Sequence, residues 1–305
     1  MSQGSNFNKP MAKPVNSGPA KAPGTSGKAI ASLVLGLLSI FGMCLTGIPG
    51  LILGIMGLND VGKSAGRLGG KGLAIAGIVL STIGIFWTVG LVLIGMLLPA
   101  VQQVRTAART VTSQNNVRQQ VLAMLNYESS NRNFPLQDNN GLSWRVHILP
   151  YIGENDLFDQ FNLAEPWDSP NNIALLPLMP LVYDCPSVSV QPGFTVYQVP
   201  YTDVNSGSNP EVKALFDNSG VAVKRGDIID GSSNTIAIVE VDAAAAVEWT
   251  KPADWEYDPN DPMHDLGNVQ PGRIVVGMID GATQTINTNV GPAQFEAMTT
   301  RNGND

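Results

Sequence analysis

The densest group of residues that could perform chemistry lies between residues 254 and 265. Its members are Asp254, Glu256, Asp258, Asp261, His264 and Asp265. Calcium prefers carboxylate and carbonyl oxygens, so Asp258, Asp261 and Asp265 are candidate metal ligands. The stretch lacks the glycine and the terminal glutamate of an EF-hand loop. A solvated, proline-rich loop is therefore the competing and stronger interpretation.

A second candidate is the pair Glu240 and Glu248, which flank an alanine-rich run. Two carboxylates can share acid and base work when they lie within several ångströms of each other. Nothing in the sequence brings these two together. Strand-end residues that face water or pair with an arginine are the favoured interpretation.

His147 and Cys185 are single residues that could titrate or react. His147 should alternate with Arg145 along a strand in SWRVHILPY, where a lone histidine usually packs. Cys185 should be a small buried residue, since free cysteine is among the most buried types. The other cysteine, Cys44, lies in an apolar stretch and cannot meet it. Nucleophile elbows, zinc-ligand spacings and phosphate loops are absent from the sequence, so we expect no enzymatic activity, no catalytic residue and no cofactor.

The charge is distributed unevenly along the chain. Residues 1–100 contain seven Lys or Arg and one acidic residue, for a net charge of +6, and the remaining residues contain eleven basic and twenty-four acidic residues, for a net charge of −13. Phosphate binding draws its affinity from clustered Lys and Arg. An acidic domain without a basic stripe therefore argues against nucleic acid as a partner.

The composition predicts three parts. Residues 1–27 are rich in Gly, Pro, Ser, Asn and Lys, and should form a disordered tail. Residues 28–100 should form a transmembrane module in contact with membrane lipid. Residues 101–305 should form an α+β domain outside the cytoplasm.

Two uncharged runs should cross the membrane. The first span should cover about residues 29–48 or 29–58, because Gly47, Pro49 and Gly50 interrupt the run near two-thirds of its length. The second span should cover residues 72–98. Gly50 and Gly54 would allow helices to approach closely.

The second span continues without a loop signal to Tyr127, so the stretch from Gly72 to Tyr127 predicts one helical unit that leaves the bilayer as a stalk. Val101, Val104, Ala108 and Val111 have helical spacing, and Val117, Val121, Met124 and Leu125 follow with a shifted phase. Two helices broken at Pro99 are the alternative.

The loop from Asn59 to Lys71 carries Lys63, Arg67 and Lys71, and the positive-inside rule places such loops in the cytoplasm. The following domain would then lie outside. A simple hairpin of two spans would also place the lysine-bearing tail outside, whereas a re-entrant first segment would place it inside. The sequence leaves both possibilities open.

The larger domain shows helix, strand and turn signals. Residues 142–149 predict a strand, residues 155–161 a short helix, and residues 169–176 a helix capped by Ser169. Residues 230–241 predict a turn and a strand, and residues 273–286 a hairpin at Asp280-Gly281. The expected fold is α+β, with a long helix packed on an antiparallel sheet.

The order of these segments resembles a known family. LLPAVQQVRTAARTV, SWRVHILPYI, FNLAEPWDSPNN, DGSSNTIAIVEV and EWTKPADWEYDP, within about residues 95–290, are similar to the pilin-like domain of unknown function 1559 of planctomycete bacteria. KAIASLVLGLLSI, GIPGLILGIMGL and GGKGLAIAGIVLS are similar to a two-span membrane module, domain of unknown function 4190. The resemblance implies a pseudopilin-like fold.

The chain departs from the pilin-like pattern at three places. A GFTLVE prepilin signal is missing, so we expect the chain not to be cleaved as a prepilin. Gln270 stands where the family commonly carries a His ten residues before Asp280, and Gln270 cannot titrate near neutrality. Ser113 stands where the family often has a Cys, so a bridge to Cys185 cannot form.

The sequence therefore predicts a non-enzymatic, membrane-anchored, pseudopilin-like protein of the cell envelope. Its location would be the bacterial inner membrane, with a role in assembly or surface interaction and with other pilin-like or secretion-system proteins as partners. The alternative is a tethered module that binds or senses an extracytoplasmic ligand or carbohydrate. Residues beyond about 100 should be accessible to protease from outside spheroplasts.

Overall fold

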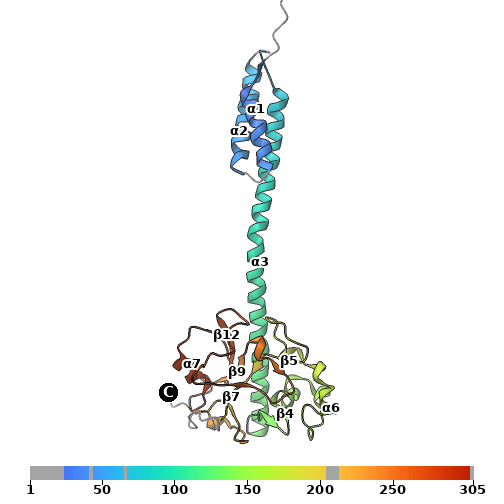
Figure 1. Cartoon of the computed structure of the whole chain (residues 1–305), viewed down its shortest axis with the longest axis vertical. Helices are drawn as coiled ribbons and strands as arrows, with labels where there is room; N and C mark the ends of the chain where they lie inside the picture. Colours follow the sequence, from blue (N-terminus) through green and yellow to red (C-terminus); the bar gives the residue numbers. More distant parts are fainter. Residues whose placement is uncertain (1–23, 41–43, 65–66, 204–212, 303–305) are drawn as a thin grey trace, which may run out of the picture. The chain divides into compact units, whose positions relative to one another are not determined.

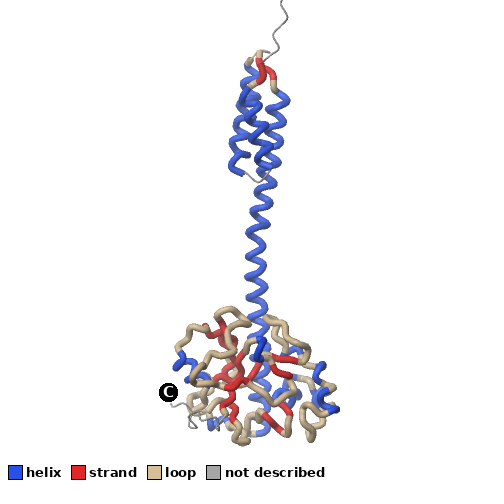
Figure 2. The backbone as a smooth tube through the Cα atoms, viewed as in Figure 1, coloured by secondary structure: helices blue, strands red, loops and turns tan. Residues whose placement is uncertain are grey.

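The computed structural model describes residues 24–40, 44–64, 67–203 and 213–302 (Figures 1 and 2). The expected disorder of residues 1–27 falls almost wholly outside these ranges. The chain forms two compact units, Met1–Val101 and Gln102–Asp305, which are described separately below. One helix, α3 (Lys71–Asn131), contributes residues to both.

Three helices build the first unit (Figure 1): α1 (Gly27–Ile40), α2 (Cys44–Lys63) and the N-terminal part of α3. By length and composition, two of the described helices can cross a membrane, namely α2 from Leu45 onward and α3. Helix α1 has 14 residues and is apolar but shorter. The chain is thus membrane-associated.

Glycine and serine residues occupy the places where these helices meet. A Cβ added to Gly50 would lie 2.6 Å from the Oγ of Ser81, and one added to Gly54 would lie 2.5 Å from a side-chain carbon of Ile78. The Ser32 hydroxyl on α1 donates a hydrogen bond to the Gly50 carbonyl at 2.9 Å. The prediction that Gly50 and Gly54 permit close helix packing is confirmed.

The expected interruption at Gly47, Pro49 and Gly50 is wrong. Helix α2 runs through all three residues, with Pro49 inside it, whereas α1 already ends at Ile40. A proline near the start of a helix removes one backbone donor, which the remaining turns tolerate here, and the glycines serve helix packing. A first span over residues 29–48 or 29–58 is thus replaced by the pair of helices α1 and α2.

The two ends of this helix pair lie side by side. Strand β1 (Gly24–Thr25) precedes α1 and pairs in parallel with β2 (Leu68–Gly69), which follows α2. The Lys28 ammonium lies 2.8 Å from a carboxylate oxygen of Asp60. The chain therefore returns, after α1 and α2, to the place where α1 began.

Helix α3 is continuous, as predicted for the stretch from Gly72 to Tyr127. It runs through Pro99 without a break, so the two-helix alternative is wrong. Its residues 101–109 are exposed, whereas Val117, Val121 and Met124 are fully buried. The shifted phase of the apolar residues thus marks the point where α3 enters the second unit's core.

The second unit is built on a four-stranded antiparallel sheet that packs against α3. In spatial order its strands are β13 (Thr283–Asn287), β12 (Arg273–Met278), β9 (Ile236–Glu240) and β6 (Tyr197–Gln198). Gly277 on β12 lets the helix approach, since a Cβ there would lie 2.6 Å from Val117 and 2.7 Å from Val121. This helix-on-sheet core confirms the α+β fold class.

Shorter elements surround this core (Figure 2). The remaining strands of the second unit are β3 (Asp138–Asn139) with β4 (Leu142–Ser143), β5 (Phe194–Thr195) with β10 (Val247–Glu248), and the parallel set β11 (Trp255–Glu256), β7 (Pro200–Thr202) and β8 (Phe216–Asp217). The α-helices are α4 (Trp144–His147), α5 (Asn155–Phe158), α6 (Pro170–Ile173) and α7 (Pro292–Thr299). The 3-10 turns are Leu149–Ile152, Leu176–Leu178, Leu181–Tyr183, Arg225–Asp227 and Ala243–Ala245.

Several local predictions can be compared with these elements. The hairpin at Asp280-Gly281 is confirmed as β12 and β13, and Ser169 caps α6 by accepting a hydrogen bond from the backbone of Asn172. The predicted strand over residues 142–149 is wrong, because α4 begins at Trp144. Ser143 caps α4 through the Arg145 amide. The prediction failed because Trp144, Arg145 and Val146 are all buried, whereas a strand with one buried face would bury only every second residue.

Candidate functional site

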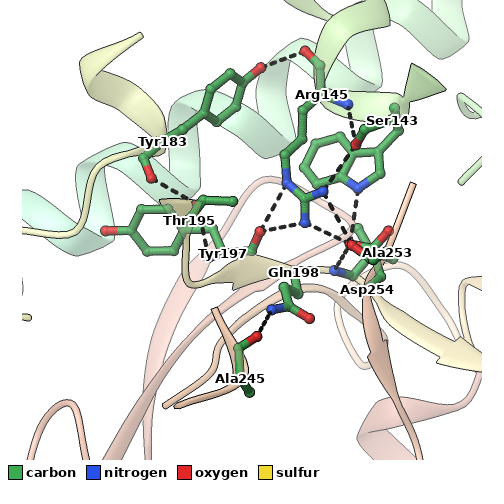
Figure 3. A network of polar contacts seen from close by, with 11 residues as sticks. Ser143, Arg145, Tyr183, Thr195, Tyr197, Gln198, Ala245, Ala253 and Asp254 are labelled. Carbon is green, nitrogen blue, oxygen red and sulfur yellow. Dashed lines mark hydrogen bonds and ion pairs between the residues drawn. The ribbon is translucent and has the colours of Figure 1, made fainter. Parts of the chain in front are cut away.

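A buried ion pair forms the centre of one polar network in the second unit (Figure 3). The Arg145 guanidinium lies 2.8 Å from the Oδ1 of Asp254, and neither side chain has any solvent exposure. Arg145 stands on α4, held there by the Ser143 cap, and Asp254 immediately precedes β11. The pair therefore connects two segments that lie more than one hundred residues apart in the chain.

Neighbouring groups satisfy most of the polar atoms of this pair. Asp254 Oδ1 also accepts hydrogen bonds from the Trp144 indole at 3.1 Å and from the Val199 amide at 3.0 Å. Arg145 donates twice to the Tyr197 carbonyl, at 2.8 and 3.2 Å, and once to the Ser143 hydroxyl at 2.9 Å. Burial raises the pKa of Asp254, and the positive charge of Arg145 opposes that rise. The network joins distant segments through Oδ1, while the second carboxylate oxygen of Asp254, Oδ2, is buried without a hydrogen-bond partner.

A second network lies between α3 and the sheet and is centred on Glu240 of β9. Its Oε1 accepts hydrogen bonds from the Ser113 hydroxyl on α3 at 2.5 Å and from the Cys185 thiol at 3.0 Å. Its Oε2 accepts one from the Gln270 amide at 3.0 Å. The Ser113 hydroxyl also contacts the Tyr197 hydroxyl at 2.9 Å. Tyr197 therefore links the two networks, because its carbonyl binds Arg145.

Burial controls the ionisation of this second network. It raises the pKa of Glu240, and the hydrogen bonds from Ser113, Cys185 and Gln270 oppose that rise. Burial, together with the neighbouring Glu240 charge, raises the pKa of Cys185 to about 12. A thiol with that pKa is not a nucleophile at neutral pH. The expectation that Cys185 is buried is confirmed, since it is 3% exposed.

The Glu240 network connects α3 to strand β9, and its burial does not suit acid–base catalysis. Glu240 is 1% exposed, so a substrate cannot reach it without displacing α3. Glu248 lies on β10 and is 3.6 Å from Lys251, and the hydrogen-bond partners of Glu240 do not include it. The expectation that Glu240 faces water or pairs with an arginine is wrong, because its donors are neutral groups.

The acidic stretch from 254 to 265 separates in the structure. Asp254 belongs to the buried network, while Asp258 is exposed and accepts hydrogen bonds from the amide and side chain of Asn260. The Asp265 carbonyl accepts from the Asp242 amide at 2.7 Å. Within the described ranges, no group of three His, Cys, Asp or Glu side chains could hold a metal ion. The geometry therefore assembles no ligand set from Asp258, Asp261 and Asp265.

Packing on an aromatic ring organises this loop. The His264 ring stacks on Trp255 with centroids 5.2 Å apart, and the Trp255 indole donates to the His264 carbonyl at 3.1 Å. His147 is also placed differently from the prediction, since it ends helix α4 and does not stand on a strand face. Neither histidine thus joins the Glu240 network.

The sequence singled out Ser113, Cys185, Glu240 and Gln270, and the family resemblance linked Ser113 to Cys185, but nothing linked these two to Glu240 or Gln270. The structure brings all four to one carboxylate. Nothing predicted from the sequence paired Arg145 with Asp254. The available signal for that pair was an arginine placed between the large apolar residues Trp144 and Val146.

Comparison with family models decides how the chain is classified. The model described as a protein of unknown function (DUF1559) matches residues 102–302, about two-thirds of the chain. The chain belongs to this family. The model of a second domain of unknown function (DUF4190) matches residues 28–93, in the expected order. Neither a curated protein nor a solved structure matched the chain.

The DUF1559 region contains both polar networks. Ser113 and Gln270, which mark two of the three departures from the expected family pattern, both donate to Glu240. Thr110 on α3 donates in turn to the Gln270 side chain at 2.8 Å. Neutral amide and hydroxyl groups thus attach α3 to the sheet in this DUF1559 member.

Proposed function

We propose that this chain is a membrane-anchored, non-enzymatic, pseudopilin-like protein of the cell envelope. It presents its DUF1559 domain outside the cytoplasmic membrane for protein assembly or surface interaction. One observation carries this proposal: α3 is uncharged and apolar from Gly72 to Leu98, and Val117 and Val121 of the same helix lie in the core of the domain. A helix that is both anchor and core element ties the domain directly to the bilayer.

The paired ends of α1 and α2 support an outside location of the domain. Because β1 pairs with β2, the chain enters and leaves this helix pair on one side of the membrane. Lys63 ends α2 and Arg67 and Lys71 follow it, while Lys28 lies in the first turn of α1 and the remaining lysines of the N-terminal segment precede α1 in the sequence. All these charges then obey the positive-inside rule together, and α3 carries the domain to the opposite side.

This arrangement supports a topology without the conflict that a simple two-span hairpin creates. Such a hairpin would place the basic tail outside. With a helix pair that returns to its starting side, the proposed tail location is the cytoplasm, whether α1 and α2 cross fully or re-enter. Helix α1 rises only about 21 Å over its 14 residues, less than the roughly 30 Å of bilayer hydrocarbon, which favours re-entry.

The burial of both polar networks supports a role without catalysis. Glu240 and Cys185 are buried and bonded to each other, and Asp254 is bonded to Arg145. The alternative, a ligand- or carbohydrate-binding module, calls for a pocket with converging carboxylates or aromatic rings. One hollow of about 460 Å³ is lined by three alanines together with Ser189, Val190, Gln191 and Phe194. Its lining supports the interaction role over ligand recognition.

Affinity capture of the intact protein from host membranes tests this proposal. The chain is solubilised in mild detergent through a C-terminal tag, and co-purifying proteins are identified by mass spectrometry. Pilin-like or secretion-system proteins are expected, with an uncleaved N-terminus on the captured chain. Capture without such proteins, or a mature chain that starts near Gly72, would contradict the proposal.

A further inference from the structure

A side-chain hydroxyl and a side-chain amide meet where α3 enters the core of the domain. Residues 101–109 of α3 are exposed, and Thr110 is the first residue after them that is partly buried. The Thr110 hydroxyl lies 2.8 Å from Oε1 of Gln270, which is 5% exposed. Because a C=O bond is about 1.23 Å long, the Thr110 oxygen lies no more than about 4 Å from the Gln270 amide carbon. This is close to the separation of about 3–3.5 Å from which one atom can attack another.

Both groups stand on a fixed backbone. The Arg273 amide donates to the Gln270 carbonyl at 2.8 Å, and Pro271 and Gly272, with a φ of 73° at the glycine, occupy the centre of this turn. Proline followed by a residue with positive φ is the pattern of a type II turn. Thr110 lies within the continuous helix α3. The fold therefore removes much of the entropy cost of bringing the hydroxyl to the amide.

A buried carboxyl group stands beside the nitrogen of the same amide. Gln270 Nε2 donates to Oε2 of Glu240 at 3.0 Å, and Glu240 is 1% exposed. Since burial raises the pKa of Glu240, this group holds a proton at pH values where an exposed carboxyl would have lost it. A hydroxyl beside the carbonyl and an acid beside the nitrogen are the groups that convert an amide to an ester. The burial that keeps an external substrate away leaves this internal one in place.

We propose that Thr110 and Gln270 are the site of an intramolecular ester cross-link, which attaches α3 covalently to the loop before β12. The Thr110 oxygen forms a bond to the Gln270 amide carbon, and its proton passes to Oε1. Glu240 gives a proton to Nε2, the carbon–nitrogen bond breaks, and ammonia leaves. The proton on Oε1 then passes to Glu240 as the carbonyl is restored. One hydroxyl and one amide become one ester and one ammonia, so the balance calls for no oxidant, reductant or co-reactant.

The surroundings of Thr110 suit both the attack and the release of ammonia. The Thr106 carbonyl lies 3.1 Å from the Thr110 hydroxyl. A hydrogen bond to that carbonyl turns a lone pair of the Thr110 oxygen toward the amide. Because Thr110 is only partly buried, solvent is close to the leaving nitrogen. Dilution of ammonia into that solvent opposes the reverse reaction.

The neighbouring hydroxyl groups of α3 have other partners. Thr112 is exposed and donates to the Ala108 carbonyl at 3.0 Å. The Ser113 hydroxyl contacts Glu240 and Tyr197. The geometry therefore selects Thr110 for the cross-link. The inference goes beyond the proposed assembly role, since it concerns how α3 is attached to its own domain.

Peptide mapping of the full-length protein tests the cross-link. Trypsin should release residues 110–118 and residues 226–273 as one species, with a mass equal to the two peptides less one ammonia. Hydroxylamine cleaves esters and spares amides, so it should split this species in two. Thr110→Val should abolish the species. Thr112→Val, the same change at an exposed position of the same peptide, should leave it intact.

A time course tests the part of Glu240 separately. In Glu240→Gln, a variant of similar size, the cross-linked species should appear at least about tenfold more slowly after synthesis, because the acid beside Nε2 is gone. Absence of the species from the wild-type protein, its persistence in Thr110→Val, or an equal rate in Glu240→Gln would overturn the inference. The mapping needs neither a partner nor a known topology, so a failed capture of secretion components leaves its outcome unaffected.

Discussion

Replacing Asp254 by alanine should strongly destabilise the domain, because it breaks the buried ion pair with Arg145. The change leaves the Arg145 guanidinium without its counter-charge at a site with no solvent exposure. It also removes the acceptor of the Trp144 indole and of the Val199 amide. Breaking one partner of a buried pair typically costs about 3–5 kcal/mol, because the remaining charge stays buried.

The expected change in melting temperature follows from the size of the domain. A domain of about 150–250 residues loses roughly 2–4 °C per kcal/mol, so Asp254→Ala should lower Tm by about 6–20 °C. Thermal unfolding of the full-length protein in detergent can be followed by tryptophan fluorescence, since Trp144, Trp249 and Trp255 are buried.

Two variants serve as controls for this prediction. Asp258→Ala removes an exposed carboxylate of the same loop, and its effect should stay within about 0.5 kcal/mol. The double variant Arg145→Met with Asp254→Asn removes both charges and should recover part of the loss. Equal Tm values for Asp254→Ala and Asp258→Ala would refute the reasoning that this pair holds the two segments together.

Three further changes test the contact between α3 and the sheet. Because burial raises the pKa of Glu240, the stabilising contribution of this residue is complete at acid pH and is lost as pH rises through the raised pKa. The Tm of Glu240→Gln relative to wild type should therefore increase from below pH 4.5 to neutrality. A Tm difference that does not depend on pH would contradict this. Ser113→Cys should form a disulfide with Cys185, because both side chains bond the same oxygen at 2.5 and 3.0 Å, and mass spectrometry without reductant should detect the cross-linked peptides rather than free thiols. Gly277→Val would place a side chain within 2.7 Å of two α3 valines and should cost more than about 2 kcal/mol, whereas Gly226→Ala, with open space around it, should cost far less in the same unfolding assay.

The sequence predicted those elements whose signals are local. A long uncharged run followed by helical spacing indicated α3, and an Asp-Gly pair between two β-rich runs indicated the β12–β13 hairpin. The strand over residues 142–149 was wrong because a capped helical turn with three consecutive buried residues imitates alternation. The break predicted near Pro49 is absent, because the close packing that the glycines allow compensates for the one backbone donor that proline lacks.

The candidate site was beyond sequence reasoning because its members come from distant segments. Glu240 meets Ser113, which lies 127 residues earlier in the chain, and Cys185, which lies 55 residues earlier. No spacing rule connects such positions. Only the packing of α3 across β9 brings their side chains to one carboxylate, and only that packing shows that the carboxylate is buried.

The central claim is that α3 carries the domain to the outside while the ends of the α1–α2 pair stay in the cytoplasm. Labelling of intact spheroplasts with a membrane-impermeant maleimide tests it most directly. One cysteine is introduced at a time, at Leu181, which is 84% exposed, or at Lys63, in a Cys44→Ser background that retains the buried Cys185. We expect Leu181→Cys to be labelled in intact spheroplasts and Lys63→Cys only after permeabilisation. Labelling of Lys63→Cys from outside, with Leu181→Cys protected, would contradict the account.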